Sequence, residues 1–381
     1  MYPTKPTISI LERLSLLGIF LQLPFRVLAL LLLSPFLKRF KKKRVNRVFT
    51  EAATRFTIGN ASIRQLQWGS TSSVDTYKSW AKGKGIPPVV EELEGNAKLI
   101  WLTEKRTDRV LVYVHGGGFV LPATVNMYSF CARIREELLQ RDDANDFGIV
   151  VPVYSLLPAK FPTQLNQLTI ALTHILSSGV KQENVILLGD SAGGNLIMQL
   201  MVHTLHPFEG VAVSPLSRVS ESNETSSLGG ICLVSPWLSL DTWTPSFVKN
   251  NDLDVLAGRS LLYWGKSYLS DVPESHHSWI KPVLCAPVPQ EPWKWLAALD
   301  EYVGRVLITA GGKENLLDDS LGLYDALKNI PNSQLDLELD VEEEGIHEDP
   351  IFDVALPQKN GGGLSGATMK IINWVGQSLG V

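Results

Sequence analysis

The chain has 381 residues, of which 45% are hydrophobic and 19% charged, and its formal net charge is -4. This balance is that of a globular protein, and the negative net charge excludes a whole-molecule attraction to nucleic acid. The length exceeds one average domain but is common for a single α/β unit, so we expect one large domain with an appendage.

The appendage is an apolar segment near the amino terminus, residues 14 to 37, interrupted by Gln22 and Arg26. As a helix it is long enough to cross a hydrocarbon core of about 30 Å. An arginine in mid-span costs about 2.5 to 3.5 kcal/mol on insertion scales, which the surrounding leucines can offset. A helix lying in the plane of the membrane is the alternative. Both interpretations predict a lipid-contacting membrane anchor over residues 1–47.

A basic block, residues 38 to 44, closes this anchor. Such a block suits an anionic membrane surface and favours a cytoplasmic position for this flank. Two glycosylation sequons, which begin at Asn60 and Asn223, would be used only in a lumen. The side of the membrane that residues 48–381 occupy therefore stays open.

Short apolar runs recur after residue 90 and have the continuous, β-branched character of strands buried on both faces. Helical stretches lie between them, so we predict an α/β fold with a mostly parallel central sheet and helices on both faces. The runs are residues 110–114, 148–153, 185–188, 230–234 and 306–309, with a weaker one at 335–339.

Residues from about 240 to 300 are rich in Trp and Pro and interrupt this rhythm. We predict that they form a helical cap together with elements from the amino-terminal part of the 48–381 domain. Trp279, Trp293 and Trp295 would suit a bulky hydrophobic alcohol, with plain packing as the alternative.

A candidate nucleophile lies in Gly189-Asp-Ser-Ala-Gly193, where one predicted strand ends and the next helix begins. This stretch fits the G-x-S-x-G nucleophile elbow. The two outer glycines relieve crowding, so that Ser191 can occupy a strained turn at the edge of the sheet.

A run of glycines, His115-Gly-Gly-Gly-Phe119, follows a second predicted strand. Bare amides at Gly117 and Gly118, with the amide of Ala192, are candidates for an oxyanion hole. A flexible turn between strand and helix is the alternative for the glycine run alone.

An elbow serine needs a base, and the order serine, acid, histidine predicts a histidine late in the chain. His347 follows the last predicted strand in a polar loop and is the candidate base. The other six histidines lie in predicted helices, in the cap or in the glycine motif, where we expect packing or surface roles.

The loop after strand 306–309 should supply the acid that fixes the imidazole tautomer and stabilises the imidazolium. Glu314 is closest to the strand end and is our candidate. Asp318 is the alternative acid, although it has the position of a first-turn residue in the following helix.

Four motifs together resemble those of the hormone-sensitive-lipase-like α/β-hydrolases. They are His115-Gly-Gly-Gly-Phe119, Tyr154-Ser-Leu-Leu-Pro158 with Phe161-Pro162, Gly189-Asp-Ser-Ala-Gly-Gly194 and Ser235-Pro-Trp237. The resemblance covers about residues 100 to 380 and implies an α/β-hydrolase fold and a serine carboxylesterase that needs no metal or cofactor. Where that family carries Asp-x-Leu-x-Asp, this chain has Glu314-Asn-Leu-Leu-Asp318, so the carried-over acid becomes a glutamate.

The apolar amino-terminal segment and the loop Gly345-Ile-His-Glu-Asp-Pro350 are similar to those of fungal steryl acetyl hydrolases. Members of that branch are membrane-anchored, remove acetyl groups from sterols and related lipophilic alcohols, and work on the lumenal side. The resemblance implies an acetyl ester of a sterol, terpenoid or other secondary metabolite as substrate, and the endoplasmic reticulum membrane as location.

Two other functions use the same scaffold. An acyltransferase or lactone-forming enzyme shares the triad and differs only in the nucleophile that reaches the acyl-enzyme. A ligand-binding receptor of this family lacks the triad histidine, so the presence of His347 counts against that function.

Overall fold

A computed structural model describes residues 6–37, 40, 43–141, 145–216, 227–283, 292–356 and 363–381. Most of the predicted basic block, residues 38, 39, 41 and 42, and the sequon at Asn223 lie outside the described residues. Within the described residues, the strands form one sheet in the order β1-β2-β4-β3-β5-β6-β7-β8. The strands are β1 (Val89–Glu92), β2 (Lys98–Trp101), β3 (Val110–Val114), β4 (Gly148–Val153), β5 (Val185–Asp190), β6 (Gly230–Val234), β7 (Arg305–Gly311) and β8 (Asp336–Glu342).

The sheet is parallel from β4 to β8, whereas β2 runs antiparallel to both β1 and β4. The predicted mostly parallel sheet is therefore confirmed. The two antiparallel strands were not predicted, because each has four residues and β1 is partly exposed with the polar sequence Val-Val-Glu-Glu. Such strands lack the long buried apolar run that marks a central parallel strand.

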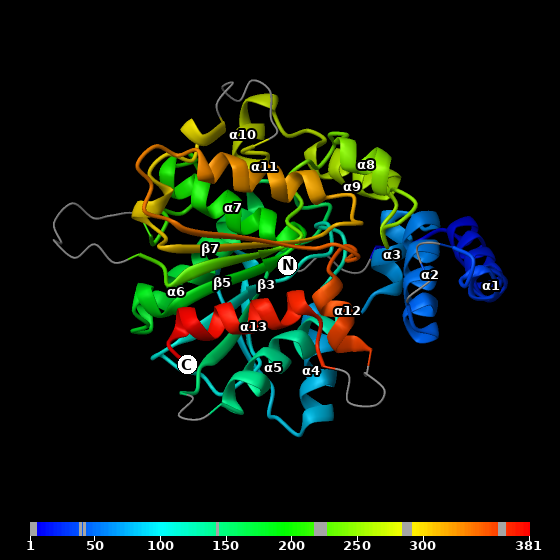
Figure 1. Ribbon diagram of the computed structural model, residues 1–381, viewed down its shortest axis with the longest axis horizontal. Helices are drawn as coiled ribbons and strands as arrows, with labels where there is room; N and C mark the ends of the chain where they lie inside the picture. Colours follow the sequence, from blue (N-terminus) through cyan, green and yellow to red (C-terminus); the bar gives the residue numbers. More distant parts are fainter. Residues whose placement is uncertain are drawn as a thin grey trace.

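Helices cover both faces of the sheet (Figure 1), as predicted. Side chains of β3 alternate between two buried clusters: Val112 points into one and Leu111 into the other. The first cluster includes residues of α6, α7 and α11, and the second includes residues of α4, α5 and α13. The helices are α1 (Ile10–Leu33), α2 (Val45–Asn60), α3 (Ile63–Gly69), α4 (Ser73–Lys84), α5 (Val125–Leu139), α6 (Thr163–Ser177), α7 (Ala192–Leu205), α8 (Pro245–Asn250), α9 (Gly258–Leu269), α10 (His277–Ile280), α11 (Leu317–Lys328), α12 (Asp349–Ala355) and α13 (Gly366–Leu379).

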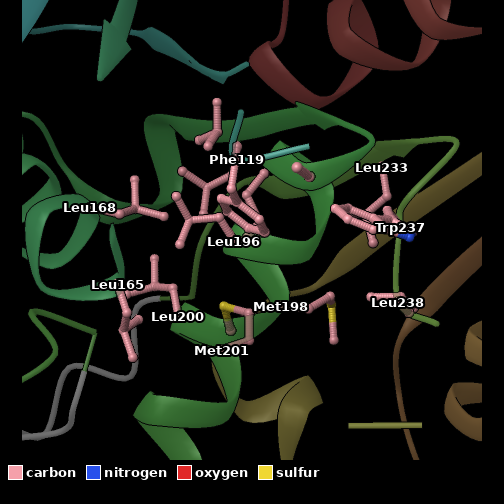
Figure 2. Close-up of a cluster of buried hydrophobic side chains, with 14 of the residues drawn as sticks. Phe119, Leu165, Leu168, Leu196, Met198, Leu200, Met201, Leu233, Trp237 and Leu238 are labelled. Atoms are coloured by element: carbon pink, nitrogen blue, oxygen red, sulfur yellow. The ribbon is translucent and has the colours of Figure 1, made fainter. Parts of the chain in front are cut away.

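Helix α7 is buried from Ala192 to Thr204. Its sequence is apolar on nearly all sides, which is typical of a helix surrounded by other elements. Figure 2 shows Leu196, Leu200 and Met201 of α7 among Phe119 and Trp237 from neighbouring segments. The helix that follows Ser191 is therefore held firmly in the core.

Helix α1 lies against α2 and α3 and is the predicted membrane segment (Figure 1). Leu16, Ile19 and Val27 face the domain and are buried, and Gln65 Nε2 of α3 donates to the Glu12 carbonyl at 2.7 Å. The helix is long and apolar enough to be a candidate membrane span. The predicted boundary between residues 47 and 48 falls inside α2.

Candidate active site

Ser191 lies between β5 and α7 with a backbone φ of 47° and ψ of -115°. A residue other than glycine in this region is strained by roughly 1–3 kcal/mol and persists only when its surroundings hold it. Here the Ser191 amide donates to the Val234 carbonyl at 2.9 Å, and the Ser191 carbonyl accepts from the Trp237 amide at 3.0 Å. The neighbouring segment after β6 thus fixes the predicted elbow.

The two outer glycines of the elbow are required by close packing. A Cβ at Gly193 would lie 1.9 Å from the Val114 carbonyl oxygen, and one at Gly189 would lie 2.8 Å from the Gly193 backbone. Real Cβ atoms do not approach backbone atoms this closely. The spacing of the motif therefore reflects the contact between β5, α7 and β3.

His347 lies in the loop between β8 and α12, and its Nε2 is 3.0 Å from Ser191 Oγ. Both side chains are buried. The structure thus brings together the predicted nucleophile and the predicted base, which are 156 residues apart in the chain. A distance of 3.0 Å allows direct proton transfer from the hydroxyl to the imidazole.

Glu314 follows β7, and its Oε2 is 3.6 Å from His347 Nδ1. This exceeds a hydrogen bond, and both Nδ1 and Glu314 Oε1 are without a hydrogen-bond partner among the described residues. Ser235 Oγ donates to Glu314 Oε2 at 2.6 Å and orients the carboxyl group. Ser235 belongs to the Ser-Pro-Trp motif. The motif contributed to the family resemblance, but it did not predict the contact with Glu314.

Asp318, the alternative acid, is used elsewhere. Its Oδ2 accepts from the Ser246 amide at 2.7 Å, at the start of α8. Across the described ranges, the ion pairs of His347 are with Glu314 and Glu348, and not with Asp318. Of the two predicted acids, the structure therefore places Glu314 next to the base.

The glycine run turns sharply after β3, with φ of 107° at Gly117 and 63° at Gly118. Both line the same cavity as Ser191 and His347. A Cβ at Gly118 would lie 2.4 Å from the Trp264 ring, so only glycine fits here. Ala192 is the first residue of α7, where the helix dipole favours negative charge.

A second pair of carboxyl groups lies beside the base, and the sequence did not predict it. Asp190 is buried and accepts from the Tyr113 hydroxyl at 2.5 Å and from the Gly116 amide at 3.0 Å. Glu348 hydrogen-bonds with Asp190, and its Oε1 is 3.5 Å from His347 Nε2. Burial, together with the adjacent carboxyl group, raises the pKa of Glu348 well above its usual range. Through the Gly116 amide, Asp190 also holds the start of the glycine run.

The charges around His347 determine its proton affinity. Burial lowers the pKa of an imidazole, but here Glu314, Glu348 and Asp254 outweigh burial and raise the pKa of His347 to about 9. Glu314 contributes most of this increase, because it faces the ring directly. The environment therefore favours the imidazolium that forms when serine loses its proton.

The site opens into a cavity of about 200 Å³ with mostly apolar walls. Thr50, Thr54 and Ile58 of α2 form one side, and Val255, Leu256, Leu261 and Trp264 form another. We predicted a cap built from the amino-terminal part and residues 240 to 300. Such a cap would place these two segments over the site.

Trp279, Trp293 and Trp295, the cap tryptophans predicted to suit the substrate, do not line this cavity. Trp279 and Trp295 pack against each other with ring centroids 5.5 Å apart, and Trp295 stacks on His206 at 3.7 Å. Their role in the described residues is packing, which was the alternative interpretation.

The parallel sheet, the strained serine between strand and helix, and the adjacent histidine define an α/β hydrolase. Solved structures agree with this class: an esterase/lipase from an uncultured bacterium is 18% identical, covers 82% of this chain and 94% of its own, and has a TM-score of 0.57. An esterase from the bacterial hormone-sensitive lipase family has 20% identity, coverage of 81% and 92%, and a TM-score of 0.54.

The particular family follows from a model described as steryl acetyl hydrolase, which matches residues 96–356. The chain belongs to this family. Steryl acetyl hydrolase 1 of Saccharomyces cerevisiae is 28% identical over 34% of this chain and 33% of its own length. Putative steryl acetyl hydrolase mug81 of Schizosaccharomyces pombe is 24% identical over 65% of this chain and 62% of its own. The chain thus matches less than two thirds of either relative. The family and the fold confirm the resemblance inferred from the motifs.

Proposed function

We propose that this chain is a serine carboxylesterase that removes short acyl groups, above all acetyl, from a hydrophobic alcohol. The observation that supports this most directly is the 3.0 Å approach of His347 Nε2 to Ser191 Oγ beneath an apolar cavity. The names of the relatives, steryl acetyl hydrolases and an arylacetamide deacetylase among them, point to the same reaction class.

In the proposed reaction, Ser191 Oγ attacks the ester carbonyl carbon as His347 Nε2 takes the hydroxyl proton. The carbonyl oxygen becomes an oxyanion that accepts hydrogen bonds from the amides of Gly117, Gly118 and Ala192. His347 then gives its proton to the leaving alcohol, which leaves an acyl-serine. Water attacks this acyl group with His347 as base, and the acid and Ser191 are released.

Glu314 is the proposed triad acid. Shortening the 3.6 Å separation between its Oε2 and His347 Nδ1 by less than an ångström would create a charge-assisted hydrogen bond. His347 Nδ1, which now lacks a partner among the described residues, would then be satisfied. We expect this contact to form as positive charge develops on the imidazole.

The substrate class follows from the cavity and the family. A cavity of about 200 Å³ lies below the roughly 300–1,000 Å³ of sites that enclose a drug-sized ligand, so it suits a short acyl group. The alcohol, a sterol, terpenoid or similar lipophilic molecule, would remain at the mouth. A substrate of this kind resides in membranes, so we propose that α1 holds the enzyme at the endoplasmic reticulum membrane.

The test combines a fluorophosphonate probe with p-nitrophenyl acetate and decanoate turnover, using the wild type and Ser191→Ala in the membrane fraction. We expect wild-type labelling, faster turnover of acetate than decanoate, and loss of labelling together with about a 10⁴-fold or greater loss of kcat in Ser191→Ala. Labelling that persists in the variant would remove Ser191 from its role. Wild-type labelling without turnover would favour the acyltransferase.

Separate replacement of the two candidate acids assigns the third member. We expect Glu314→Ala to lower kcat far more than Asp318→Ala, because the Asp318 carboxyl group caps α8 and does not face His347. An unchanged rate in Glu314→Ala would overturn this assignment.

A further inference from the structure

Asp254 bonds the two loops that carry the proposed acid and base. It lies between α8 and α9 and is buried. One carboxylate oxygen, Oδ1, accepts from the His347 amide at 3.0 Å and from the Val255 amide at 2.7 Å. The other, Oδ2, accepts from the amide of Asn315, the residue after Glu314, at 2.9 Å. A single side chain thus reaches the base itself and the neighbour of the acid.

Asp254 is not placed to touch substrate. It does not line the cavity that contains Ser191 and His347. Among the described residues, the side-chain hydrogen bonds of Asp254 all come from backbone amides, so its carboxylate acts as a triple acceptor. Buried charge-assisted bonds of this kind are about twice as strong as neutral ones and fix the groups that make them.

The bonds of Asp254 lie next to the contact between His347 and Glu314, which is too long for a hydrogen bond. His347 Nδ1 and Glu314 Oε2 are 3.6 Å apart, and their separation depends on how the loops after β7 and β8 lie against each other. These loops also share one backbone bond, from the Lys313 amide to the Gly345 carbonyl at 2.8 Å. That bond lies before both catalytic groups, whereas Asp254 bonds at His347 and directly after Glu314.

The position of Asp254 is set from the cap side. Arg55 of α2 donates from Nη1 to the Asp254 carbonyl oxygen at 2.9 Å, and the Asp254 amide donates to Asn250 at the end of α8. Helix α2 also forms a wall of the cavity through Thr50 and Thr54. The cap therefore places the carboxylate that spaces the two loops.

We propose that Asp254 is a positioning residue that sets the alignment of His347 with Glu314, an inference that rests on the proposed function. Its negative charge is also one of three, with Glu314 and Glu348, that face His347 and raise the pKa of the imidazole. Removing the Asp254 charge therefore lowers that pKa.

The test uses Asp254→Asn. The new NH₂ group takes the place of Oδ2 and cannot accept from the Asn315 amide, so one of the three hydrogen bonds of the carboxylate is lost. Rates are expressed per active site titrated to completion with the fluorophosphonate, so that unfolded protein does not count. We expect kcat for p-nitrophenyl acetate to fall about 10- to 100-fold with KM nearly unchanged, as for a small misplacement of catalytic groups. We expect the midpoint of the acid limb of kcat/KM to move to lower pH.

Asp319→Asn is the matched control. Asp319 is also buried, and its Oδ2 accepts two backbone amides, those of Leu238 and Ser239, at 2.6 Å each. We expect it to lower the melting temperature and to leave the midpoint in place. The double variant Glu314→Gln/Asp254→Asn should lose little beyond Glu314→Gln, because both changes act on one contact.

Wild-type kcat and an unmoved midpoint in Asp254→Asn would overturn the inference, as would an equal effect of Asp319→Asn. If Asp254→Asn yields no titratable enzyme, Asp254→Glu keeps the charge but displaces the loops, and wild-type kcat in that variant would also overturn the inference. Failure of the proposed function is a different result, since the wild type itself would then show no turnover, with or without labelling.

Discussion

At the scale of single residues, the site concentrates negative charge around one imidazole. Glu314, Glu348 and Asp254 lie on different sides of His347 and raise its pKa to about 9. A base must be neutral to accept the serine proton, so this arrangement has a measurable cost near neutral pH.

We expect kcat/KM for p-nitrophenyl acetate to rise with pH, with a midpoint well above the ordinary histidine value of about 6.5 and towards 9. In Glu314→Gln the midpoint should move to lower pH, because the carboxylate that raises the pKa of His347 most is removed and the imidazolium loses its proton more easily. Its kcat should fall at all pH values. A pH series corrected for spontaneous hydrolysis measures both, and an unmoved midpoint would contradict the role of Glu314.

Single residues also show what a sequence can predict of a site. Ser191 and His347 are candidates from the sequence alone because each belongs to a local motif at the end of a predicted strand. Ser235, Asp254 and Glu348 are not, because their roles arise from contacts across distant segments, such as Asp254 with His347, 93 residues away. A buried carboxylate that accepts only backbone amides leaves no pattern along the chain.

At the scale of elements, the central strands were predictable because both faces of each are buried, which requires continuous apolar runs. The short strands β1 and β2 at the sheet edge were not, because they lack such runs. The apolar residues of the cap predict burial but do not reveal which tryptophan meets the cavity: Trp264 of α9 does, and Trp295 does not.

The contact between β5, β3 and α7 should make the elbow sensitive to one methyl group. In Gly193→Ala the new Cβ would meet the Val114 carbonyl oxygen at 1.9 Å, so strands or helix must shift. We expect a loss of roughly 3 kcal/mol or more in unfolding free energy, at the upper end of overpacking effects, measured by urea denaturation. Gly83→Ala in α4 is the control: its Cβ meets nothing within 4 Å, so we expect no loss.

The packing of α9 against the glycine run should limit acyl length. Trp264→Leu enlarges the cavity beside Gly118, so we expect the ratio of decanoate to acetate turnover to rise about 10-fold, a modest effect typical of apolar pockets. Trp295→Leu, away from the cavity, should leave the ratio unchanged. An equal ratio in both variants would show that Trp264 does not limit acyl length.

At the scale of the whole molecule, α1 presents an apolar face outward along its length. Leu14, Leu21, Phe25, Leu28 and Leu32 are each more than half exposed. These positions recur at helical spacing, whereas the buried Leu16, Ile19 and Val27 face the domain. An outward stripe of this kind is a surface that the proposed membrane association would cover.

We expect Leu21→Asp/Leu28→Asp to move the protein from the membrane fraction towards the soluble fraction, because two charges would enter that stripe. Turnover of p-nitrophenyl acetate per titrated site should stay near the wild-type value, since neither residue lines the cavity. Sedimentation and active-site titration measure the two effects. Val213→Asp, at a residue 79% exposed elsewhere, is the control and should leave the distribution unchanged. If the double variant also stays with the membrane, the stripe is not what anchors the protein.

Helix α2 contacts both the cavity and α1. Its residues Thr50, Thr54 and Ile58 line the cavity, and the same helix packs against α1. A shortened protein for crystallisation that starts after residue 40 would lack α1. Ala61 and Leu66, which cluster with Leu16 and Ile19 of that helix, would then be exposed to solvent. Aggregation or a changed ester preference in such a preparation would then result from the exposed surface around Ala61 and Leu66, and would not be a property of the native enzyme. Polar replacements on that surface are therefore a prerequisite for any soluble form.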